Sequence, residues 1–115
     1  KWKDLYQNYD SVENKLFIDL LKFIKKTSLE KNISTNFVYF PDVVYLSVNN
    51  NNTRLQAWKN FISYAGEQGI NINNPWEFFI EHSSKTNLSW SYVDDHPNCE
   101  ANQIMSKYLS NLFTF

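Results

Sequence analysis

A chain of 115 residues with a formal net charge of −1 is long enough to bury one hydrophobic core without metal or disulfide support. Its charge balance does not suggest polyanion binding by the chain as a whole, and it leaves room for a local basic face. Aromatic residues make up 17% of the chain, which is high and indicates an aromatic-rich core with some rings left for an interface. With only Gly66 and Gly69 as glycines, the chain contains neither G-x-G-x-x-G nor G-x-x-x-x-G-K-[ST], so nucleotide binding through those loops is excluded.

The chain opens with signals for two helices. In residues 1–9, aromatic and apolar side chains recur at helical spacing and indicate a short first helix: Trp2, Leu5, Tyr6 and Tyr9. A longer amphipathic helix is predicted over residues 12–27, because Asp10 and Glu13 form a capping-box-like start. A stripe of apolar side chains follows, and we expect it to face the core: Leu16, Phe17, Leu20, Leu21 and Ile24.

The middle of the chain alternates strand and helix signals. Residues 37–48 are rich in β-branched and aromatic types, and Pro41 interrupts them, which predicts two short strands or one bent edge strand. A helix is predicted from Thr53 to the neighbourhood of Gly66 or Gly69, where glycine can take a positive φ. A short helix follows at Asn74-Pro75-Trp76-Glu77, an order of residues typical of a helix start.

Two further elements complete the chain and define the expected fold. Residues 88–93 alternate apolar and small polar side chains, which predicts a strand able to pair with residues 43–48. Residues 99–112 form the last amphipathic helix. The fold class is therefore α+β, with about four helices packed on a small antiparallel sheet of two to three strands.

The organisation of the chain favours one domain spanning residues 1–115, because no repeat and no long linker divides it. The chain begins at Lys1 rather than Met, so we expect it to be excised from a longer protein. Its single cysteine cannot form an internal disulfide, which favours an intracellular location in cytoplasm or nucleus. No apolar run of about 18 residues occurs, so no membrane partner is expected.

The segment S-Y-V-D-D-H-P-N-C-E, residues 91–100, concentrates polar and reactive side chains. Asp94, Asp95, Pro97 and Asn98 are turn formers and helix caps, so we interpret the segment as a polar turn that opens the last helix. The competing interpretation is a cysteine-dependent hydrolase, with Cys99 as nucleophile in the first turn of that helix and His96 as its base. Against it, nothing in the sequence marks an oxyanion hole, and no family-specific cysteine signature is present.

Metal and cofactor binding are not predicted. His96, Cys99, Asp94 and His82 are the nearest approach to a ligand set. The chain contains neither an H-x-x-x-H nor a C-x-x-C pair, the spacings that place two ligands on one metal. We therefore expect neither a metal nor a cofactor.

Lysines in the first third of the chain indicate a second class of function. A nucleic-acid-binding helical module would use a basic group built mostly on one helix: Lys22, Lys25, Lys26, Lys31 and Arg54. The helix at 17–26, Trp58 in a middle helix and Lys107-Tyr108-Leu109 at the end resemble the helical AT-rich interaction domain family. The central Gly-Gly turn of that family is absent here, and residues 70–98 would be an insertion, so the chain is not assigned to it.

The preferred interpretation is a non-enzymatic domain that binds another protein, either as a subunit module of a larger assembly or as a small inhibitor or immunity-type protein. Tryptophan and tyrosine beyond the needs of a core are enriched at protein interfaces. Charge is also polarised: residues 1–35 carry seven lysines against five acids, and residues 75–115 carry two lysines against five acids. The predicted partner-binding residues are aromatic at one end and acidic at the other: Trp2, Tyr6, Tyr9, Asp94, Asp95 and Glu100.

Overall fold

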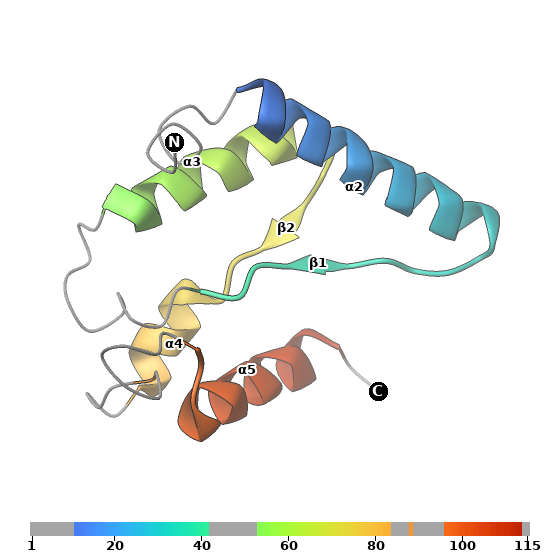
Figure 1. Cartoon of the computed structure of the whole chain (residues 1–115). Helices are drawn as coiled ribbons and strands as arrows, with labels where there is room; N and C mark the ends of the chain where they lie inside the picture. Colours follow the sequence, from blue (N-terminus) through green and yellow to red (C-terminus); the bar gives the residue numbers. More distant parts are fainter. Residues whose placement is uncertain (1–10, 42–52, 84–87, 89–95, 114–115) are drawn as a thin grey trace. The chain divides into compact units, whose positions relative to one another are not determined.

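A computed structural model describes residues 11–41, 53–83, 88 and 96–113. The described elements, in chain order, are α2 (Val12–Glu30), β1 (Phe37–Val38), α3 (Thr53–Glu67), β2 (Ile72–Asn73), α4 (Trp76–His82) and α5 (Cys99–Leu112) (Figure 1). The chain divides into two compact units. Unit 1 comprises Lys1–Phe37 and Thr53–Asn73, and unit 2 comprises Val38–Asn52 and Asn74–Phe115. A single domain over the whole chain stays a prediction.

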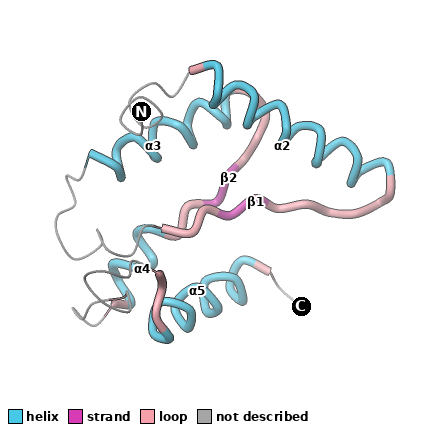
Figure 2. Tube along the Cα trace, viewed as in Figure 1, coloured by secondary structure: helices cyan, strands magenta, loops and turns pink. Residues whose placement is uncertain are grey.

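The α+β class is confirmed, with four helices and a two-stranded sheet in the described ranges. The predicted antiparallel orientation is wrong: β1 and β2 pair in parallel (Figure 2). The helix α3 lies between these strands in sequence, and a helical crossover returns the chain in the direction in which it left. The side-chain amide of Asn73 reinforces the pairing by donating from Nδ2 to the Phe37 carbonyl oxygen at 3.1 Å.

Unit 1 is held together by apolar contacts between α2, α3 and the turn after α3. Its buried side chains are Ile18 and Leu21 from α2, together with Phe61, Ala65 and Ile70. Trp58 packs edge-on against Phe61, with ring centroids 5.8 Å apart and planes at 87°. Edge-to-face geometry brings the positive edge of one ring to the negative face of the other, which stabilises this contact beyond area burial.

The helix α2 confirms the predicted long helix, begins at Val12 as predicted and extends to Glu30, but its capping residue and its buried side differ from the expectation. Ser11, not Asp10, is the N-cap, and its hydroxyl accepts a hydrogen bond from the Asn14 amide at 3.3 Å. Leu21 is the buried residue of the predicted stripe, and Ile18, outside that stripe, is the other buried residue of α2. The remaining members of the stripe are exposed: Leu16, Phe17, Leu20 and Ile24.

Both helices of unit 1 end in the same hydrogen-bonded turn, the Schellman motif. After α3, the Ile70 amide donates to the Ala65 carbonyl at 2.9 Å and the Gly69 amide to the Gly66 carbonyl at 3.0 Å. Gly69 therefore takes a φ of +87°, the left-handed region that glycine enters without strain. After α2, Asn32 takes this position with a φ of 58°. Ile70, which follows the turn, is thereby directed into the core.

Substituting each glycine by alanine should distinguish Gly69, which occupies the left-handed turn position, from Gly66, which lies inside α3. We expect Gly69→Ala to lower the free energy of unfolding by about 1–2 kcal/mol, because an L-residue is strained at that φ. Gly66→Ala is the matched control and should raise stability by about 0.5–1 kcal/mol, because Gly66 lies inside α3 with open space around its Cα. Urea denaturation measures both, and equal effects would contradict the assigned turn.

Unit 2 is built on α4 and α5. Its core contains Phe79, Leu88, Ala101, Ile104 and Met105, with Phe78 and Tyr108 packed against it. The short helix is present, but its predicted start is one residue off: Pro75 is the N-cap of α4 and Trp76 its first residue. Asn74 Oδ1 accepts a hydrogen bond from the Trp76 amide at 3.1 Å. Trp76 is buried. The predicted bounds of the last helix, 99–112, are those of α5.

Candidate functional site

Most of the predicted partner-binding residues lie outside the described residues, namely Trp2, Tyr6, Tyr9, Asp94 and Asp95. Glu100 is half-buried in the first turn of α5. Negative charge is favoured there by the helix dipole, which accounts for an acid at this position without a partner protein. The assignment of these residues to an interface stays a prediction.

The segment around Cys99 forms a capped helix start. The Asn98 side chain accepts a hydrogen bond from the Ala101 amide at 3.0 Å, and the Asn98 amide donates to the Leu88 carbonyl at 2.8 Å. Cys99 is the first residue of α5 and is exposed. The interpretation as a turn that opens a helix fits this geometry, while a hydrolase using Cys99 and His96 stays a prediction. Within the described ranges, no three histidine, cysteine or acidic side chains gather to hold a metal ion.

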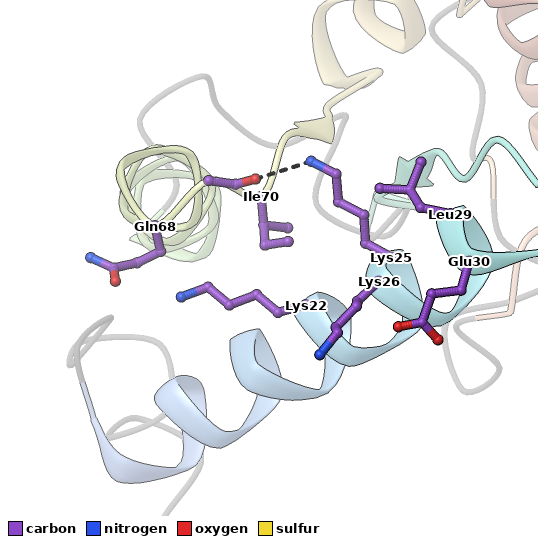
Figure 3. Close-up of a pocket in the computed structure, with 8 residues that line it drawn as sticks. Lys22, Lys25, Lys26, Leu29, Glu30, Gln68 and Ile70 are labelled. Carbon is purple, nitrogen blue, oxygen red and sulfur yellow. Dashed lines mark hydrogen bonds between the residues drawn. The ribbon is translucent and has the colours of Figure 1, made fainter. Parts of the chain in front are cut away.

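The predicted lysine group is brought together only in part. Lys22, Lys25 and Lys26 line an open hollow of about 590 Å³ between α2 and the turn Gln68–Ile70 (Figure 3). Lys31 does not line it. Arg54 lies in the first turn of α3, and its side chain is outside the described part of the structure.

The hollow has a structural role that competes with phosphate binding. Lys25 Nζ donates to the Gly69 carbonyl oxygen at 3.4 Å, so this ammonium from α2 meets the end of α3. The last turn of α3 has no basic residue of its own, and helix C-termini attract positive charge. Glu30 also lines the hollow and would repel an anion. Lysine spacing predicted the cluster, whereas the contact of Lys25 with a residue 44 positions away could not be read from the sequence.

A different surface emerges on α2, and sequence reasoning assigned it to the core. Seven large apolar side chains on this helix are solvent-exposed. Five of them lie three and four residues apart, and we call these the α2 apolar face: Leu16, Phe17, Leu20, Phe23 and Ile24. Phe23 is 66% exposed, Leu16 63% and Leu20 53%. Phe23 is the residue from which the face could have been recognised in the sequence, because it lies beside the predicted stripe. Together with the stripe it makes the apolar part of α2 wider than one core can cover.

The face is fixed in place by the opposite side of the same helix. Ile18 and Leu21 anchor α2 in the core of unit 1. Phe17 borders that core, with its ring centroid 5.9 Å from the ring of Phe61. The α2 apolar face therefore presents side chains from a regular helix whose orientation is set by packing, an arrangement that lowers the entropy lost on binding.

No protein-family description, curated protein or solved structure matches this chain in the comparisons. None of the helices in the described ranges has the length and apolar character that crossing a bilayer requires.

Proposed function

We propose that this chain is a non-enzymatic protein-interaction module, and that the α2 apolar face is its contact surface. The observation that carries the proposal is the exposure of five large apolar side chains on one helix. Single exposed apolar residues are ordinary in soluble proteins, but a contiguous group marks an interaction surface. A helix presenting residues three and four apart is a recurring mode of protein recognition.

The proposal keeps the predicted function, binding of another protein, but places the contact surface on α2 instead of on the aromatic and acidic residues predicted from the sequence. Side chains such as Phe23 and Leu20 would lose apolar surface to a partner, which stabilises a complex without requiring any charged ligand. The lysine hollow is the competing site, and binding to nucleic acid through it would weaken steeply with rising salt. Binding centred on the α2 apolar face should depend on salt only modestly.

A pull-down from native lysate tests the proposal, with and without nuclease. The bait is the tagged chain, the double variant Leu16→Gln/Leu20→Gln, or the control Leu29→Gln. Leu29 is also exposed on α2, by 62%, but it lines the hollow and is not part of the α2 apolar face. Glutamine keeps helix propensity close to that of leucine, so α2 should stay intact.

We expect a stoichiometric protein that survives nuclease treatment, is lost with the double variant and is kept with Leu29→Gln. Two results would contradict the proposal. One is capture that the double variant leaves unchanged, and the other is loss of every captured protein on nuclease treatment, which would favour the lysines.

A further inference from the structure

We draw no further inference here: the strongest candidate, the exposed apolar patch that Leu16, Leu20 and Phe23 form on α2, already carries the proposed function, and nothing in the structure shows which partner covers it.

Discussion

Replacing Phe79 with alanine should lower the free energy of unfolding of unit 2 by about 3–5 kcal/mol, the largest stability effect that we expect from a single change in this chain. Phe79 is fully buried in the core of unit 2, where it packs among Leu88, Ile104 and Met105, and its ring lies 5.8 Å from that of Phe40. Removing the ring loses its transfer free energy and leaves a cavity between α4 and α5. Folded proteins are stable by only about 5–15 kcal/mol, so a loss of this size is a large share of the margin.

Urea denaturation followed by far-ultraviolet circular dichroism measures the effect. Leu112→Ala is the control from the same unit, because Leu112 is exposed at the end of α5, and its loss should cost less than about 1 kcal/mol. If Phe79→Ala and Leu112→Ala were equally mild, the assigned core of unit 2 would be wrong.

The buried and exposed sides of α2 should differ strongly in how much stability they lose on substitution by alanine. Ile18 is 2% exposed in the core of unit 1, so Ile18→Ala should destabilise the protein by about 2–5 kcal/mol. Leu16, two positions away on the same helix, is exposed, and Leu16→Ala should change the stability by less than about 0.5 kcal/mol. Alanine has the highest helix propensity, so neither change weakens the helix itself.

This pair of substitutions is measured by thermal or urea denaturation in dilute solution, where association through α2 contributes least. The sequence-based prediction makes the opposite claim, because it places Leu16 in the core and leaves Ile18 outside the buried stripe. A larger loss for Leu16→Ala than for Ile18→Ala would restore that prediction and remove the α2 apolar face.

The helices α5 and α2 differ in how much of their structure could be predicted from the sequence. The bounds of α5 were predictable because its cap, Asn98, and its buried residues Ala101, Ile104 and Met105 all indicate one helix with one apolar side. The helix α2 was equally predictable as a helix. Which side of it is buried was not, because apolar residues occupy two of its sides and periodicity does not tell which of them meets α3.

The orientation of the sheet and the tertiary contact of Lys25 could not be predicted from the sequence, for a different reason. The strands β1 and β2 contain two residues each, too few for any alternation to appear, and their parallel pairing depends on the path of the chain through α3. The clustering of Lys22, Lys25 and Lys26 follows from helical spacing and was predictable. The contact of Lys25 with the Gly69 carbonyl, just past the end of α3, is tertiary and could not be read from the sequence, while phosphate binding by the cluster stays a prediction.

The most direct test of the central claim, that the α2 apolar face binds protein, is site-specific photo-cross-linking in native lysate. Phe23 and Leu29 are replaced in turn by the photoreactive p-benzoylphenylalanine; the two side chains are similarly exposed, by 66% and 62%, and only Phe23 belongs to the face. After irradiation, mass spectrometry identifies each adduct. We predict a discrete protein adduct, a second copy or another chain, from position 23 and none of comparable yield from position 29. Equal adducts from both positions, or an adduct from position 29 alone, would contradict the claim.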